Sequence, residues 1–146
     1  MMNELIKYHE SLAVLIARLF LGILFFFQGF DAVFRVRVSN VIQAYQSQFT
    51  SNRMPRLLIV LGTYFTSYVE LICGFLLIIG FFEFSSLFLL GTSLIVASIA
   101  FSVISPMWDM KFLFPRLLLL LFLLLMPITF DIFSVDSLIE FLRNKP

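Results

Sequence analysis

The sequence predicts an all-α fold, an integral membrane four-helix bundle with a short amphipathic interfacial helix between helices 1 and 2. The first supporting observation is composition: of the 146 residues 61% are hydrophobic and only 13% are charged, against about 25% charged in soluble domains. The second is the grouping of apolar residues into four runs, at about 12–34, 57–82, 84–104 and 112–133. Each run is near the ~20 residues that a helix needs to cross a bilayer. We therefore expect one four-span membrane domain over residues 1–146.

Prolines and short connections mark the ends of these spans. Pro55 precedes the second span, Pro106 closes the third, and Pro115 falls in the first turn of the fourth, where a missing N–H does little harm. Only a few residues around Glu83 join the second span to the third. These two spans are therefore predicted to form a tight antiparallel hairpin.

Two shorter segments have the pattern of amphipathic helices at the membrane surface. At about 39–50, apolar residues recur at helical spacing opposite Asn and Gln residues, and Ser39 is available as the N-cap. At about 135–143 the apolar residues again share one face, and Ser134 or Asp136 can cap the helix. Both segments are predicted to lie in the interface.

The charged residues indicate the partners of the chain more clearly than its orientation in the membrane. A net charge of +1 provides no basic surface for nucleic acid, so the expected partners are the lipid bilayer and other membrane protein subunits. An even number of spans places both termini on the same side of the membrane. The loops carry more Lys and Arg than the termini, which favours termini outside the cytoplasm by the positive-inside rule.

Ionisable residues inside the spans are the main candidates for a site, because each costs ~2.5–3.5 kcal/mol at a helix centre on insertion scales. Arg18 and Glu70 lie at depths that an arginine side chain can bridge, and Asp131 leaves the fourth span on the same side. We expect a buried Arg18–Glu70 pair with Asp131 as a third member. A structural pair that fixes helix register and a site for a ligand, quinone or proton are the two interpretations.

Two further polar groups accompany this pair. Thr63 and Ser67 share one face of the second span with Glu70, and Tyr64 and Tyr68 lie beside that face. These four residues, Thr63, Tyr64, Ser67 and Tyr68, are candidates for lining a polar cavity or a quinone site.

The second polar group lies near the opposite ends of the spans. Arg116 enters the fourth span at a depth similar to that of Gln28 and Asp31 on the first. Gln28, Asp31 and Arg116 are therefore predicted to form a second polar cluster, in which Arg116 pairs with Asp31 or extends to the interface.

The residue inventory excludes several chemistries. Cys73 is the single cysteine and His9 the single histidine, so the chain has no internal disulfide, no Cys/His zinc site and no haem held by two intramembrane histidines. We predict no metal site, no catalytic residue and no intrinsic cofactor. A quinone is the one redox group that the chain could hold, without covalent attachment.

Two stretches carry a resemblance to a known family. RLFLGILF at 18–25, followed by QGF at 28–30, resembles the first-helix motif of the DoxX-like membrane proteins, and ELICGFLLIIG at 70–80 resembles their second-helix pattern. The resemblance implies a four-helix bundle in the bacterial cytoplasmic (inner) membrane, associated with quinone-linked oxidoreductases. Family members are usually drawn with cytoplasmic termini, opposite to the charge distribution, so the side of the termini is left open.

Three classes of function follow. The preferred hypothesis is a non-catalytic integral membrane subunit or assembly factor of a larger inner-membrane complex. The alternative is a quinone-interacting component of a membrane oxidoreductase, with the quinone beside Glu70. A small transporter or channel is the third hypothesis, supported only by the intramembrane charges.

Overall fold

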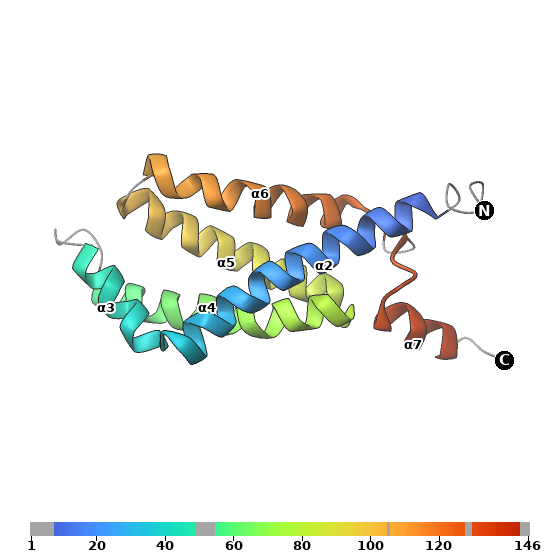
Figure 1. Ribbon diagram of the computed structural model, residues 1–146, viewed down its shortest axis with the longest axis horizontal. Coiled ribbons are helices and arrows are strands. Elements are labelled where there is room, and N and C mark those ends of the chain that lie inside the picture. Colours follow the sequence, from blue (N-terminus) through green and yellow to red (C-terminus); the bar gives the residue numbers. More distant parts are fainter. Residues whose placement is uncertain (1–7, 49–54, 105, 128–129, 144–146) are drawn as a thin grey trace.

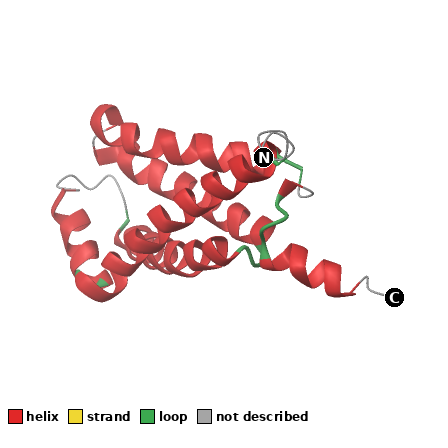
Figure 2. Ribbon diagram, turned by 45° about the vertical axis from the view of Figure 1, so that its right-hand side comes forward, coloured by secondary structure: helices red, strands yellow, loops and turns green. Residues whose placement is uncertain are grey.

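The computed structural model describes residues 8–48, 55–104, 106–127 and 130–143, and every regular element in this part of the chain is helical. Figure 2 shows these helices joined by short loops. The predicted all-α class is confirmed. In chain order the elements are α2 (His9–Phe30), the π-helix η1 (Asp31–Arg35), α3 (Val38–Gln48), α4 (Arg56–Ile79), α5 (Glu83–Ile104), α6 (Pro106–Leu125) and α7 (Val135–Arg143).

The long helices α2, α4, α5 and α6 run back and forth along the longest axis of the molecule (Figure 1). α2 packs on α4, α4 on α5, α5 on α6, and α6 also contacts α2. Their shared core includes the fully buried Leu21, Phe25, Leu77 and Leu90. α2 begins and α6 ends beside α7, at what we call the terminal end, whereas α3 lies at the opposite end, the α3 end (Figure 1).

Among the described residues, three helical stretches are long and apolar enough to cross a membrane. They are His9–Arg35 with 27 residues, Arg56–Ile79 with 24 and Glu83–Val103 with 21. In α6 the apolar helical stretch is shorter, Leu113–Leu125, and at 1.5 Å per residue it covers only about 20 Å of a hydrocarbon core about 30 Å thick.

The fourth helix differs from its predicted bounds of 112–133. α6 begins at Pro106, so the segment predicted as a loop is already helical, and it ends at Leu125, just before Pro127. Pro115 therefore lies inside the helix instead of in its first turn. The apolar run in the sequence does not show where α6 ends, because the residues that follow Pro127 are also mostly apolar.

Glycines set the register between α2 and α4. Gly29 lies against the backbone of Leu71, and a Cβ atom at Gly74 would come within 2.5 Å of the Phe26 backbone nitrogen. The two backbones can approach this closely because neither glycine carries a side chain. This register places Gly29 beside Glu70 and brings Arg18 to Gly80, near the end of α4.

The turn between α4 and α5 also holds α7 in place. Gly80 ends α4 with φ +70°, a conformation that favours glycine, and its carbonyl accepts a 3.0 Å hydrogen bond from the Asp136 N–H. The Asp136 carboxylate accepts hydrogen bonds from the N–H groups of Phe82 and Glu83, at 3.2 and 3.0 Å. Asp136 thus caps α5, whereas the Ser134 hydroxyl caps α7 by accepting from the Ser137 N–H.

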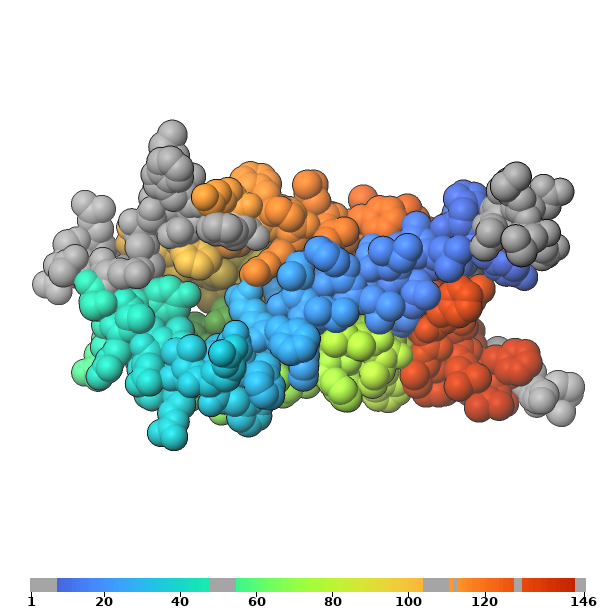
Figure 3. Space-filling view, in the orientation of Figure 1, coloured from blue at the N-terminus to red at the C-terminus, as the bar shows by residue number. Residues whose placement is uncertain are grey.

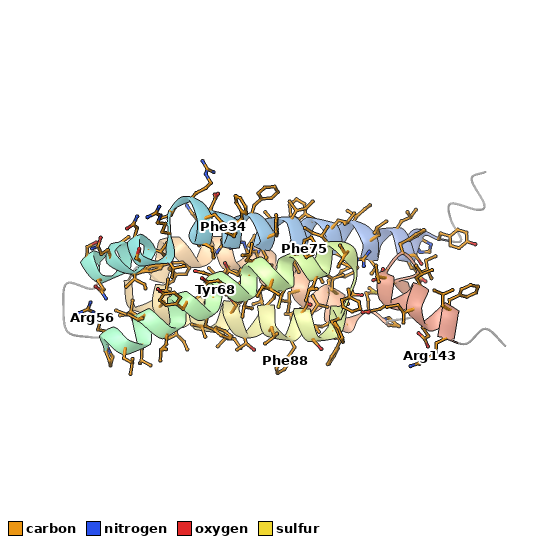
Figure 4. All side chains as sticks on the ribbon, turned by 90° about the horizontal axis from the view of Figure 1, so that it is seen from below. Phe34, Arg56, Tyr68, Phe75, Phe88 and Arg143 are labelled. Carbon is orange, nitrogen blue, oxygen red and sulfur yellow. The ribbon has the colours of Figure 1, made fainter. Side chains whose placement is uncertain are left out.

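Large apolar side chains cover the outside of the molecule. Phe75 on α4 and Phe88 on α5 are both more than half exposed, and Figure 4 shows Phe88 pointing away from the bundle. Such a surface would be unfavourable in water but matches the hydrocarbon core of a bilayer. Several polar and charged side chains, among them Arg18, Ser67 and Glu70, are instead buried inside the bundle.

Candidate functional site

Arg18 is neutralised by the C-terminal part of the chain. Its Nη1 lies 3.2 Å from Oδ2 of Asp131, and both side chains are only 2% exposed. Its Nη2 donates a 2.9 Å hydrogen bond to the Phe133 carbonyl. The segment that follows α6 thus folds back to α2 and supplies both partners of the buried cation.

The predicted Arg18–Glu70 pair does not form. The register of α2 against α4 brings Arg18 to Gly80, which lies ten residues beyond Glu70, or about 15 Å along the helix. The depth argument from sequence placed the two charges within reach because it fixed the membrane boundary by composition. The glycine contacts set the true register, and they leave Glu70 in a separate group.

Glu70 lies in the middle of α4, at one side of a cavity of about 530 Å³ that we call the α3-end cavity. Residues of α2, α4, α5 and α6 line this cavity, and residues of η1 and α3 line it at the α3 end. Figure 3 shows the molecular surface hollowed beside α3. Most of the lining is apolar, and the long helices contribute six polar side chains to it: Gln28, Thr63, Thr66, Ser67, Glu70 and Arg116.

The Glu70 carboxylate is held by neighbours on three other helices. Its Oε1 accepts a 3.1 Å hydrogen bond from the Ser93 hydroxyl of α5. It also interacts with the Gln28 amide of α2 and, through charge, with Arg116 of α6. The Arg116 guanidinium carbon lies 5.8 Å from the centre of the Phe25 ring, within the range of a cation–π contact. The Glu70 carboxylate is therefore hydrogen-bonded to α5 and lies close to polar groups of α2 and α6 beside the cavity.

The polar face predicted for α4 divides into two parts. Thr63 and Ser67 are buried and line the cavity. Tyr64 and Tyr68 do not line it: they are 44% and 45% exposed, and their rings stack on each other at 6.3 Å. One residue along a helix turns the side chain by about 100°, which carries both tyrosines from the cavity to the outer surface.

The second predicted cluster is also only partly formed. Gln28 and Arg116 both line the cavity with Glu70, so the structure joins them to the first group of candidates. Asp31 is not with them, because its carboxylate pairs instead with Arg35 one turn later, at 3.1 Å on the surface. The local i, i+4 partner on η1 takes the place of Arg116.

Sequence analysis missed Ser93, whose hydroxyl is part of this site. The position of Ser93 in the sequence does indicate a contact with Glu70. Glu70 lies ten residues before Gly80, and Ser93 lies ten residues after Glu83, so both are equally far from the turn between α4 and α5. In a tight antiparallel hairpin, positions equally far from the turn lie at the same height, so the donor could have been paired with the acid.

This arrangement can bind a ligand that is apolar over most of its surface and polar at one end. The volume of about 530 Å³ falls within the usual range of ligand pockets, about 300–1,000 Å³. Gln28 and Arg116 offer N–H donors, and Glu70 offers a carboxylate acceptor. No group of three or more His, Cys, Asp or Glu side chains in the described part of the chain is arranged to hold a metal ion.

A comparison with protein families matches this chain to the model of DoxX over residues 13–103. The match covers α2 through almost all of α5, and so includes every described cavity residue except those of α6. No curated protein and no solved structure matches the chain. The chain belongs to the DoxX family of membrane proteins.

Proposed function

We propose that this DoxX-family protein is a non-catalytic subunit of a bacterial inner-membrane oxidoreductase complex, and that it binds a quinone in the α3-end cavity. The observation that carries this proposal is the cavity of about 530 Å³ at the middle depth of α4, apolar along its walls and polar where Glu70 lies. In this assignment α6 serves as the fourth membrane-spanning helix, and the chain forms a four-span bundle.

The lining fits a quinone headgroup. A quinone carbonyl needs a hydrogen-bond donor, and Gln28 and Arg116 provide N–H groups beside an apolar slot. Glu70 would accept a hydrogen bond from the hydroxyl of the reduced form. The quinone supplies two-electron redox chemistry, whereas the protein binds and orients it.

The separation of Glu70 from Arg18 strengthens this proposal over a purely structural role. A carboxylate fully engaged in neutralising Arg18 would be unsuited to binding a ligand. Asp131 neutralises Arg18 instead, and Glu70 lines the cavity, where it accepts a hydrogen bond from Ser93 and interacts with Gln28 and Arg116. A transporter has no comparable support from a specific contact.

The test is binding of ubiquinone-1 to the purified protein in nanodiscs. We expect saturable binding that weakens by about tenfold, or about 1.4 kcal/mol, in Ser67→Leu, because the larger side chain fills the polar part of the cavity. The matched control is Ser98→Leu, since Ser98 lies on α5 outside the cavity lining and donates only to the Ile95 carbonyl. Equal affinities of the two variants would contradict the proposal.

Membership of a complex is tested separately. The outer face of α6 exposes leucines, among them Leu121, and α3 exposes Gln43. We expect a photocrosslinker at one of these positions in native membranes to capture another membrane subunit. Crosslinks to lipid or to a second copy of this chain alone, at both positions, would contradict the subunit assignment.

A further inference from the structure

The α3-end cavity reaches the outer surface of the bundle between two of the long helices. Three of its lining residues, Leu58 and Leu61 of α4 and Ile99 of α5, are each more than half exposed. A residue that both lines a cavity and is exposed lies at the mouth of that cavity. We propose that the ligand enters sideways from the bilayer, between α4 and α5, and that its apolar tail stays in this mouth. The inference rests on the proposed function and specifies the ligand as a quinone with a long isoprenoid tail.

The contact between α4 and α5 fixes where this mouth lies. A Cβ atom at Gly62 would lie 3.4 Å from Cγ1 of Val96, so the two helices touch at this height. Because the helices run in opposite directions, one turn toward the α3 end sets Leu58 opposite Ile99 and Ala100. In Figure 1 the two helices move apart toward the α3 end. The mouth therefore lies on the α3 side of the contact between Gly62 and Val96.

The mouth suits a hydrocarbon chain. It belongs to the stretches Arg56–Ile79 and Glu83–Val103, which are long and apolar enough to cross a membrane, so its exposed side chains face lipid. A strongly hydrated ligand would lose its water on this route without gaining a polar contact. The side chains that form the mouth are all apolar: Leu58, Leu61, Val96, Ile99 and Ala100.

The polar end of the cavity lies deeper in the bundle. Glu70 is nine residues beyond Leu61, which is about 14 Å along α4, and Thr63 and Ser67 line the path between them. This length accommodates a quinone ring beside Glu70 and the first part of its tail. The cavity volume of about 530 Å³ is too small for the whole tail of ubiquinone-10. The rest of such a tail must therefore pass through the mouth into the lipid.

The first test is displacement of tritiated ubiquinone-1 from the protein in nanodiscs, with each competitor expressed as a fraction of the lipid. Ubiquinone-10 should compete within about threefold of unlabelled ubiquinone-1, because most of its tail remains in lipid whether it is bound or free. Ubiquinone-1 binding without competition by ubiquinone-10 overturns this inference and leaves the proposed function standing. Absence of ubiquinone-1 binding overturns both.

Two matched pairs of tryptophan variants test the position of the mouth. Ile99→Trp and Leu61→Trp should each weaken competition by ubiquinone-10 about tenfold, because the indole ring fills the mouth. Ubiquinone-1 should keep its affinity, since its short tail stays inside the cavity. The controls Ile95→Trp and Leu57→Trp should change neither ligand, because these residues are exposed one turn away on the same helices but do not line the cavity.

Circular dichroism of each variant checks that the helices are retained. The inference is overturned if ubiquinone-10 competes undiminished in both Ile99→Trp and Leu61→Trp. It is also overturned if the control variants Ile95→Trp and Leu57→Trp lose as much competition as these two.

Discussion

The buried Arg18 and Glu70 side chains are satisfied in different ways. Arg18 has one carboxylate and one carbonyl as partners, both from the segment that follows α6. Glu70 has a hydroxyl donor from α5 and faces a cavity. The first charge therefore fastens the C-terminal segment to the bundle, whereas the second lines the α3-end cavity.

The Arg18–Asp131 pair is predicted to be a structural contact. Arg18→Met or Asp131→Leu alone should lower the free energy of unfolding in detergent by about 3–5 kcal/mol, because each leaves a buried charge without its partner. The double variant should recover much of that loss. A double variant no more stable than the less stable single variant would contradict a direct pair.

A second double variant separates this pair from the one expected from sequence. Arg18→Met combined with Glu70→Leu should show no recovery, since Arg18 lies beside Gly80, about 15 Å along α4 from Glu70, and its ion pair is with Asp131. Recovery of stability in this variant would support a direct Arg18–Glu70 pair and would contradict the α2–α4 register described above.

At the scale of elements, contact between α2 and α4 depends on where glycine occurs. Gly29 lies against the backbone of Leu71, so an added methyl group would force the helices apart. Gly91 on α5 is different, because its nearest neighbour is a flexible Leu120 side chain, 3.6 Å from the position of an added Cβ. Alanine substitutions at these two glycines therefore distinguish the effect of helix packing from the effect of helix propensity on stability.

Gly29→Ala is predicted to destabilise the protein, by about 1–3 kcal/mol as for other overpacked contacts. Gly91→Ala should be neutral or stabilise it by about 0.5–1 kcal/mol, because alanine is the better helix former and the space exists. Unfolding curves of both variants in the same detergent test this difference. Equal effects would show that the α2–α4 approach is less tight than the structure indicates.

The sequence predicted the elements better than their contacts. The apolar runs and the amphipathic pattern located α2, α4, α5 and α7 closely, because helix periodicity and span length are local properties. The end of α6 was misplaced, since the apolar run continues past Pro127. The partner of Arg18 was also misassigned, because the register between two helices depends on packing that a single sequence does not reveal.

At the scale of the whole molecule, the bundle has two ends with different chemistry. The α3 end holds the larger cavity, with a mainly apolar lining and one buried carboxylate that has a hydroxyl donor. The terminal end holds the smaller cavity, with four carboxylates and the Arg18–Asp131 pair. The composition indicated a membrane protein with buried polar groups, but only the fold divides those groups between two cavities.

The packed core of the bundle separates the two cavities. Leu21, Phe25, Leu77 and Leu90 fill the bundle as fully buried side chains, and none of them lines either cavity. Sequence reasoning could list Gln28, Glu70 and Arg116, yet it grouped them by depth alone. Their meeting at one cavity depends on which helix faces are turned inward, and that is set by the packing of all four long helices.

The most direct test of the central claim is photolabelling with an azido-quinone in nanodiscs, followed by peptide mapping. We predict saturable labelling of residues 28–36 and 58–70 and of the second half of α5, which line the α3-end cavity, and competition by ubiquinone-1. Labelling confined to outward-facing residues such as Phe88, or labelling that ubiquinone-1 does not reduce, would contradict a quinone site in this cavity.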